Sequence, residues 1–277
     1  MKKFLLILIL CSIISPSYAF GFRSAERDVK NVILSQFKYA NRGNFDKFIS
    51  TFDPNYVNSD GFNLEVYSNI VKNVWSSYDN IRYGVKIKNV EVNNDRAVID
   101  VTEYTNADLP LSKKYTGILT SQSESTYYLS KTNGKWKVVS DSVSDETTKM
   151  LYGIAKNMDI SLRVPNEVKA DTEYTATLEF ETPEGVISIA SIAVDKVEYP
   201  QPQTKEVFRP MPEDNILERL FTANNENANE YVLASFGLTK TAVCDLSVKM
   251  SLLGFGYVIK RVNVLPANQN EIANDKN

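Results

Sequence analysis

Near its middle the chain reads Thr126-Tyr127-Tyr128-Leu129-Ser130-Lys131-Thr132-Asn133-Gly134-Lys135-Trp136-Lys137-Val138-Val139-Ser140-Asp141, and this stretch predicts a β-hairpin. Asn133-Gly134 suits a two-residue type I′ turn, because both central residues of that turn need a positive φ. β-Branched and aromatic residues flank the turn on both sides. An isolated hairpin is only marginally stable in water, so the rest of the chain must supply a sheet that receives it.

A two-residue loop also sets which residues of the hairpin lie opposite each other. The expected opposite pairs are Leu129 with Val138 and Lys131 with Trp136 on one face, and Tyr128 with Val139 and Thr126 with Asp141 on the other. We expect Trp136 to lie in the core or in a pocket wall.

Residues 1–19 have the pattern of a secretory signal peptide. Lys2-Lys3 precedes an apolar run from Phe4 to Ile14, and Ala19 is a small residue where signal peptidase cuts. The run is shorter than the ~20 apolar residues of a membrane-spanning helix. We therefore expect an exported bacterial protein, periplasmic or secreted, whose mature chain begins at Phe20.

A lipoprotein signal through Cys11 is the alternative to simple cleavage. Leu10 stands before this cysteine, where a small residue is expected in lipoproteins, so the pattern favours cleavage after Ala19. Since no later segment is long and apolar enough to span a bilayer, we expect no integral membrane segment after cleavage.

Composition excludes several classes of function. The formal net charge is −3, and loss of the signal peptide removes two lysines and no acid, which moves the charge to −5. An acidic mature chain argues against nucleic acid as a partner. Histidine is absent, which removes the usual general base, the usual zinc ligand and every Ser-His or Cys-His device. We expect no cofactor.

Two motifs that could hold ions have structural explanations. Asp53-Pro54-Asn55 with Asp60-Gly61 lacks the glycine and carboxylate spacing of an EF-hand loop, so we expect no metal. Gly254-Phe255-Gly256 lies inside a strand pattern, where glycines more often mark a bulge than a phosphate site.

Helical periodicity dominates the first part of the mature chain. A first helix is predicted from about Ala25 and a second from Phe45 to Phe52, which ends before Pro54. A third helix is predicted from Leu64 to about Tyr78. Its apolar stripe is Val66, Ile70, Val74 and Tyr78, and it is widened by Tyr67, Val71 and Trp75.

Alternation follows, with two antiparallel strands around the turn at 93–95 and a further strand at 115–120 before the hairpin. Helices followed by such a meander imply an α+β layer, in which the helices cover one face of a curved antiparallel sheet.

These patterns bring a family into view. The helix, the Gly43-Asn44-Phe45-Asp46 break, the Phe52-Asp53-Pro54-Asn55-Tyr56 ending and the hairpin at Asn133-Gly134-Lys135-Trp136 resemble NTF2-like (SnoaL-like) domains. The resemblance covers roughly residues 25–150, and it implies a cone-shaped fold with a deep pocket for a domain at 20–150. It does not imply one function, since such folds host isomerases, dehydratases, ligand binders and interaction modules.

The second half has a different texture. A linker is expected at 151–157, with helical character through Met150, Leu151 and Ile154. Residues 158–267 then contain six or seven short strands, which predicts a β-sandwich. Val164-Pro165-Asn166-Glu167-Val168 and the strand after it resemble bacterial immunoglobulin-like domains. Residues 268–277 are polar and aperiodic, so we expect a disordered tail.

Four residues are candidates for ligand binding in the first domain: Asp53, Tyr56, Glu103 and Tyr128. Asp53 and Tyr56 end the second helix, Glu103 shares a strand face with apolar residues, and Tyr128 or Asp141 lies on one face of the hairpin. A carboxylate among apolar neighbours has a raised pKa and could act as an acid or base. The alternative is ordinary: Asp53 is a turn residue and Glu103 a solvated strand-end residue.

The sequence favours binding over catalysis, and we assign no catalytic residue. The expected partner is a small apolar or amphipathic ligand or a protein segment, and a homodimer through the N-terminal sheet is left open. A histidine-independent hydrolase or isomerase is the alternative function. The absence of histidine and of paired carboxylates at helical spacing favours the binding protein.

Overall fold

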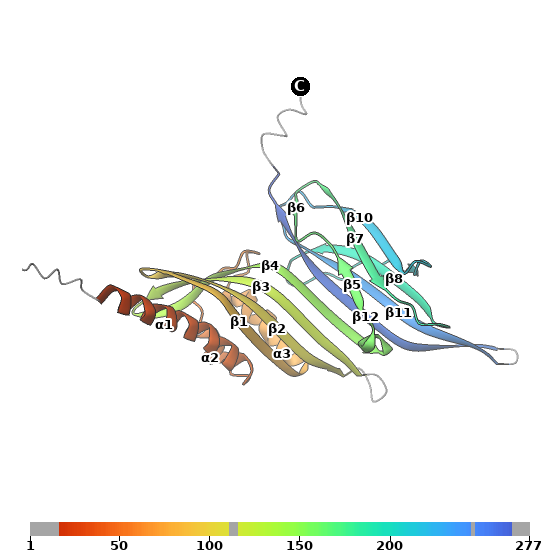
Figure 1. The fold of residues 1–277 in the computed structure, drawn as a ribbon, viewed down its shortest axis with the longest axis horizontal. Helices are drawn as coiled ribbons and strands as arrows, with labels where there is room; N and C mark the ends of the chain where they lie inside the picture. The colour runs from red at the N-terminus through yellow and green to blue at the C-terminus, as the bar shows by residue number, and fades with distance from the viewer. Residues whose placement is uncertain (1–16, 111–115, 245–246, 268–277) are drawn as a thin grey trace, which may run out of the picture.

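The computed structural model describes residues 17–110, 116–244 and 247–267, with side chains for 24–109, 116–242 and 249–267. Residues 1–16 of the predicted signal peptide lie outside the described residues, as does the predicted tail at 268–277. The described chain is mostly β-structure with a few helices, and it forms an elongated molecule with the helices gathered towards one end (Figure 1).

The described elements follow one another in the order α1 to α3, β1 to β4, a 3₁₀ helix η1 and β5 to β12. Their bounds are α1 Ser17–Ala40, α2 Phe45–Ile49, α3 Leu64–Ser77, β1 Asp79–Asn93, β2 Arg96–Pro110, β3 Thr116–Thr132, β4 Lys135–Gly153, η1 Ile154–Asn157, β5 Ile160–Arg163, β6 Glu167–Lys169, β7 Glu173–Phe180, β8 Ile187–Lys196, β9 Arg209–Pro210, β10 Ile216–Thr222, β11 Glu230–Cys244 and β12 Ser247–Leu265.

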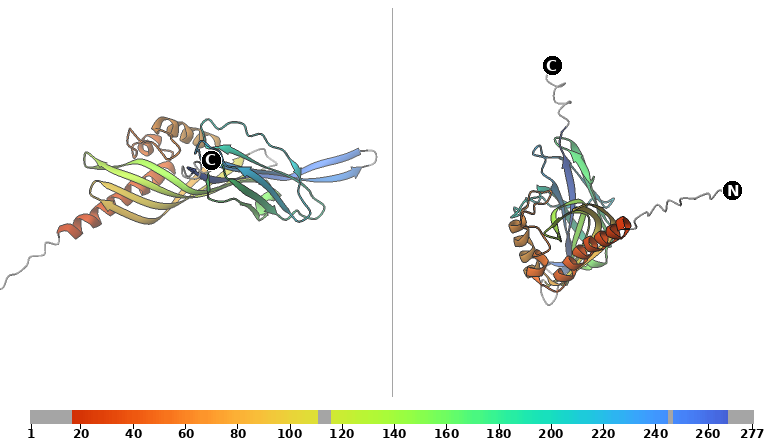
Figure 2. Two further views of the ribbon diagram at one scale, coloured as in Figure 1. Left: turned by 90° about the horizontal axis from the view of Figure 1, so that it is seen from above. Right: turned by 90° about the vertical axis from the view of Figure 1, so that its left-hand side faces the viewer.

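The three predicted helices are confirmed, but α1 begins at Ser17 rather than near Ala25, and α2 ends at Ile49 rather than at Phe52. Asn44 and Asn63 are the N-caps of α2 and α3, where their side chains accept hydrogen bonds from the backbone N–H groups of Lys47 and Val66. All three helices pack on one face of the β1–β4 sheet (Figure 2). The shared core joins α1, α2 and α3 to β2, β3 and β4, through residues that include Val29, Ile33, Phe48, Val71, Ile99, Val101, Leu129, Trp136 and Val138.

The buried face of α3 is formed by the residues that were predicted to widen the apolar stripe, rather than by the stripe itself. Val71 is the buried residue of this helix, and Tyr67 and Trp75 pack beside it against the core. These residues follow each other at a spacing of four, so they form one face of the helix. The aromatic face therefore packs inward, because its rings fill more of the space between helix and sheet than the β-branched stripe could.

The hairpin forms as predicted at its turn. Asn133 and Gly134 have φ values of 52° and 75°. Leu129 lies opposite Val138, and Lys131 lies opposite Trp136.

Further from the turn the predicted register is wrong by one residue. Tyr128 lies opposite Ser140 rather than Val139, and Thr126 lies opposite Ser142 rather than Asp141. The cause is a β-bulge that leaves Val139 as an extra residue in β4. Asp141 consequently pairs with Tyr127, on the face of the sheet that packs against the helices.

The two halves share one sheet, which corrects the predicted linker. Strand β4 continues through residue 153 and pairs with β12, so residues 151–153 are strand and only Ile154–Asn157 form a short 3₁₀ helix. The helical character expected at Met150 and Leu151 is wrong for the same reason, whereas Ile154, which belonged to the same expectation, begins the 3₁₀ helix. The division into two domains stays a prediction.

Glycines in β12 allow the close approach of these strands. A Cβ on Gly254 would lie 2.7 Å from the backbone oxygen of Tyr152, and one on Gly256 would lie 2.7 Å from side-chain atoms of Leu151 and Phe236. Leu238 lies opposite Gly254 and Thr239 lies opposite Leu252, so Leu253 is an extra residue in β12. This β-bulge lies directly before Gly254, the first of the glycines at which a bulge was predicted.

The described second half contains two sheets around one core. Strands β12, β11, β8 and β9 continue the large sheet, while β10, β7 and β5 form a separate three-stranded sheet. One cluster of buried residues, among them Leu178, Phe180, Ile192, Phe236 and Val258, fills the space between them. The large sheet is thus a layer of both halves, in the order β1-β2-β3-β4-β12-β11-β8-β9.

Candidate functional site

A small cavity of about 110 Å³ lies between the helices and the inner face of the sheet. Residues from α1, α2, α3, β1, β2 and β3 contribute to it, so its shape depends on the packing of the whole first half. Its lining combines aromatic rings with a few polar groups, which is typical of small-molecule sites. The lining residues are Gln36, Phe37, Ala40, Phe48, Tyr67, Val71, Trp75, Tyr83, Glu103, Thr105 and Tyr127.

Glu103 is the acidic residue of this lining. Glu103 lies on the inner face of β2, where it follows the buried residues Ile99 and Val101. The three residues share this face because side chains alternate between the two faces of a strand. The hydroxyl of Tyr127 donates a hydrogen bond to Oε1 of Glu103 at 2.9 Å. This contact holds the carboxyl group against the next strand of the sheet.

Burial raises the pKa of Glu103 from its ordinary value of 4.5 to about 7. The hydrogen bonds from Tyr127 and Ser125 act in the opposite direction, and the charges of Asp141 and Glu146 raise the pKa further. Glu103 therefore exchanges its proton near neutral pH, and it can either donate or accept a hydrogen bond in the cavity.

Gln36 is the second polar residue of the cavity lining that we consider in detail. It lies on α1 between Ile33 and Ala40, and its side chain is 2% exposed. Neither its Nε2 nor its Oε1 has a hydrogen-bond partner among the residues that the structure describes. An amide buried without partners destabilises a fold by about 1–3 kcal/mol, so such a group in a cavity wall calls for an explanation.

Aromatic side chains form the rest of the wall. Trp75 donates from Nε1 to the hydroxyl oxygen of Tyr83 at 2.9 Å, which ties α3 to β1. Burial raises the pKa of Tyr83 to about 12 and the pKa of Tyr67 well above its ordinary value. Both hydroxyls therefore stay neutral at physiological pH, so they offer hydrogen bonds without adding charge.

Tyr56 and Asp141 lie outside the cavity lining and contact each other. The hydroxyl of Tyr56 donates to Oδ2 of Asp141 at 2.6 Å, and Tyr56 is fully buried. Burial raises the pKa of Asp141 to about 6, against the opposing effect of this hydrogen bond. The bulge at Val139 makes the contact possible, because it turns Asp141 towards the helices.

Of the four candidates, only Glu103 lines the cavity. Tyr56 is a core residue bonded to Asp141, and Asp53 closes a turn by accepting from the backbone N–H of Asn55 at 2.9 Å. Tyr128 is 40% exposed on the opposite face of the sheet from the helices. Asp53 and Tyr128 therefore do not line this cavity, and their predicted part in ligand binding stays a prediction.

Sequence reasoning missed Gln36, Tyr83 and Tyr127 as members of the site. For Gln36 a signal was present, because a polar residue falls at helical spacing within the apolar stripe of the first helix. For Tyr127 a signal was present too, because strand alternation places it on the same face as Leu129, two residues further along β3.

No protein-family model matches the chain, and no curated protein sequence matches it. Similar solved structures cover less than half of it. They include Bdellovibrio bacteriovorus Bd1075, with 17% identity and a TM-score of 0.38 over 47% of this chain and 42% of that one. An NTF2-like protein with a cystatin-like fold from Novosphingobium aromaticivorans shares 11% identity and a TM-score of 0.38, over 48% of this chain and 90% of that one.

A proposed dehydratase of the NTF2-like family from Streptomyces avermitilis shares 16% identity and a TM-score of 0.36, over 46% of this chain and 95% of that one. The neighbours thus include NTF2-like proteins, as the resemblance of residues 20–150 implies, and none supports an immunoglobulin-like second half. These TM-scores are below 0.5, so the function proposed below is derived from the residues of the site.

Proposed function

We propose that this protein binds a small amphipathic molecule, or the end of a longer one, in the cavity lined by Gln36 and Glu103. The observation that carries the proposal is the buried amide of Gln36, which has no partner among the described residues. A ligand that exchanges hydrogen bonds with this amide would remove the cost of burying it. The unbound site is therefore less stable than a site filled by a matching ligand.

The cavity limits the size and chemistry of the ligand. Its volume of about 110 Å³ is well below the roughly 300–1,000 Å³ of pockets for drug-sized molecules. The side-chain amide of Gln36 needs a ligand with both a hydrogen-bond acceptor and a hydrogen-bond donor, and the ionised carboxylate of Glu103 accepts hydrogen bonds. Phe48, Val71 and Trp75 provide an apolar wall. A short primary amide with an alkyl group combines these properties.

Calorimetric titration with acetamide, propionamide and isobutyramide tests the proposal, with the alkane alcohols of the same size as comparison. We expect an amide to bind and Glu103→Gln to weaken it. Absence of binding by all three amides to the wild-type protein would contradict this ligand class.

A hydrolase or isomerase in the same cavity is the second candidate. Its support is the pKa of about 7 at Glu103, which is near the value that suits a general acid or base at neutral pH. Turnover of small esters or isomerisable ketones by the wild type, lost in Glu103→Gln, would establish this function. Binding without turnover would exclude it for those substrates.

Export is part of the proposal. Residues 1–19 carry the signal pattern, and the mature chain is expected to begin at Phe20. Among the described residues, no helix has the length and apolarity to cross a membrane. Intact-mass measurement of the mature protein tests the cleavage site, and a lipid adduct on Cys11 would contradict it.

The second half is proposed to serve as a docking module, with the immunoglobulin-like identity of its sandwich as a working assignment. A homodimer through the N-terminal sheet is a further arrangement to test, and sedimentation of the mature protein would detect it.

A further inference from the structure

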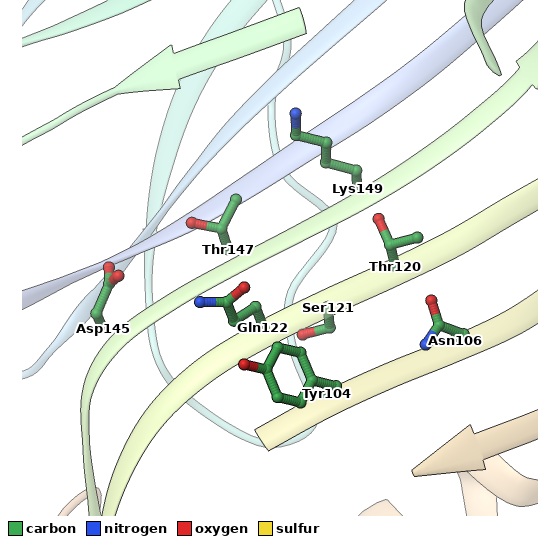
Figure 3. Close-up of a pocket in the computed structure, with 8 residues that line it drawn as sticks. All are labelled: Tyr104, Asn106, Thr120, Ser121, Gln122, Asp145, Thr147 and Lys149. Atoms are coloured by element: carbon green, nitrogen blue, oxygen red, sulfur yellow. The ribbon is translucent and has the colours of Figure 1, made fainter. Parts of the chain in front are cut away.

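A second and larger cavity, of about 410 Å³, lies on the outer face of β2, β3 and β4, opposite the helices. Figure 3 shows its eight lining residues, which extend from three adjacent strands. They are Tyr104, Asn106, Thr120, Ser121, Gln122, Asp145, Thr147 and Lys149. This volume falls within the usual range of small-molecule sites.

The register of the sheet arranges most of this lining in two rows across the strands. Gln122 lies opposite both Tyr104 and Thr147, and Thr120 lies opposite both Asn106 and Lys149. Residues opposite each other in a sheet have Cβ atoms about 4.5–5.5 Å apart, so each row presents three neighbouring side chains. The backbone of the sheet holds this grid, which gives the site a rigid base.

Uncharged hydrogen-bonding groups dominate the grid. Asn106 and Gln122 each offer an amide oxygen and an amide N–H₂ group, and Thr120 adds a hydroxyl group. Within the part of the chain that the structure describes, none of these three side chains makes a hydrogen bond to the protein. Their donors and acceptors are therefore available to a ligand that presents several hydroxyl groups.

The charges of the cavity have partners within the protein. Lys149 donates from Nζ to the backbone oxygen of Ile160 at 2.6 Å. Oδ1 of Asp145 lies 3.2 Å from Nζ of Lys260, which pairs the two charges, although this buried oxygen accepts no hydrogen bond from the described residues. Since the cation and the anion are both engaged, the cavity favours a neutral ligand over an anion or a cation.

Tyr104 adds a flat aromatic surface at one end of its row. Its side chain is 38% exposed beside the amide of Gln122. The face of an aromatic ring is electronegative, so it attracts the weakly positive C–H groups that lie on one face of a sugar ring. An exposed ring next to free amides is a combination that an apolar ligand would not need.

We propose that this outer cavity binds a neutral carbohydrate, with Tyr104 stacked on a sugar ring and Asn106, Thr120 and Gln122 bonded to its hydroxyl groups. The site is separate from the inner cavity, because it lies on the other face of the same strands. The two sites can therefore be tested independently.

Calorimetric titration of the mature protein with maltotriose, cellotriose and triacetylchitotriose tests the proposal, with a heparin disaccharide as the anionic comparison. We expect one neutral oligosaccharide to bind. Tyr104→Ala should weaken it by about tenfold, and Gln122→Ala should weaken it several-fold. Tyr104→Phe, which keeps the ring, should bind as the wild type does.

Tyr128→Ala is the matched control, because Tyr128 is an exposed tyrosine on the same face of the sheet but outside the cavity. It should leave binding unchanged, and circular dichroism should show that all variants fold. No binding of any neutral oligosaccharide up to about 10 mM, stronger binding of the heparin disaccharide, or binding that Tyr104→Ala and Gln122→Ala leave intact would each overturn the proposal.

Discussion

The guanidinium group of Arg261 in β12 contacts both carboxylate oxygens of Asp60, at 3.0 Å and 2.6 Å. The pair joins the second half of the chain to the loop before α3, across 201 positions of sequence. Both side chains are almost fully buried, with 1% and 7% exposed. Asn229 also donates to Asp60, at 2.7 Å, and Asn263 accepts from Nε of Arg261, at 2.8 Å.

Arg261→Met should therefore lower the free energy of unfolding by about 3–5 kcal/mol, because it leaves the Asp60 carboxylate buried without its cation. Urea denaturation measures the change. The matched control is Arg163→Met, which removes an ion pair to Glu179 whose side chains are 59% and 44% exposed. It should cost at most about 1 kcal/mol. Equal losses in the two variants would show that the buried pair does not hold the halves together.

The stability of the protein should decrease as the pH rises from about 4.5 to 7. Glu103 is protonated in the folded state up to its pKa of about 7, whereas in the unfolded state it loses its proton near 4.5. Over this pH interval the free energy of unfolding therefore decreases progressively, by up to about 3 kcal/mol in total. Asp141, with its pKa raised to about 6, should add to the same trend.

Glu103→Gln should flatten this pH dependence while keeping an acceptor for Tyr127. The variant should match the wild type near pH 4 and be more stable at pH 8. Urea denaturation at a series of pH values checks this expectation. A wild-type stability that rises between pH 4.5 and 7 would indicate that Glu103 is ionised and well stabilised in the fold.

Trp136→Ala should lower the free energy of unfolding by about 3–5 kcal/mol, as deletions of large aromatic side chains do in packed cores. Trp136 is 6% exposed and belongs to the core that joins the helices to the sheet. Thermal and urea denaturation provide the measurement, with Trp136→Phe as a variant that keeps a ring. A melting curve like that of the wild type would contradict the central place of the hairpin in the core.

Gly134→Val should destabilise the turn by roughly 1–2 kcal/mol. The residue has a φ of 75°, and a Cβ placed there would meet no atom within 4 Å, so the expected cost is strain in the backbone alone. Gly134→Asn should cost less, because asparagine tolerates this conformation better. Equal stability of the valine variant and the wild type would rule out the type I′ turn.

Local patterns predicted much of the first half. The helices, the strands around 93–95 and the turn at Asn133-Gly134 follow from periodicity and turn chemistry, which act over a few residues. The bulge at Val139 was not predicted, because no residue type marks it in the sequence. It moved Asp141 to the inner face, where its partner Tyr56 lies 85 positions away.

Contacts between the two halves could not be predicted from local sequence patterns either. The pairing of β4 with β12 and the bond of Asp60 to Arg261 depend on how distant segments meet. Asp60 alone resembles a solvated loop residue. For the candidate site, Glu103 was predicted from its apolar strand neighbours, whereas Gln36 required knowledge of which face of α1 is buried.

The most direct test of the binding proposal is Gln36→Met, measured both by urea denaturation and by titration with the amide that the wild type binds. Methionine keeps a similar shape without the buried amide, so the free energy of unfolding should rise by about 1–3 kcal/mol while amide binding is lost. Lys38→Met, at an exposed position of the same helix, is the control and should change neither quantity. A destabilised Gln36→Met variant that still binds the amide as the wild type does would contradict the proposed site.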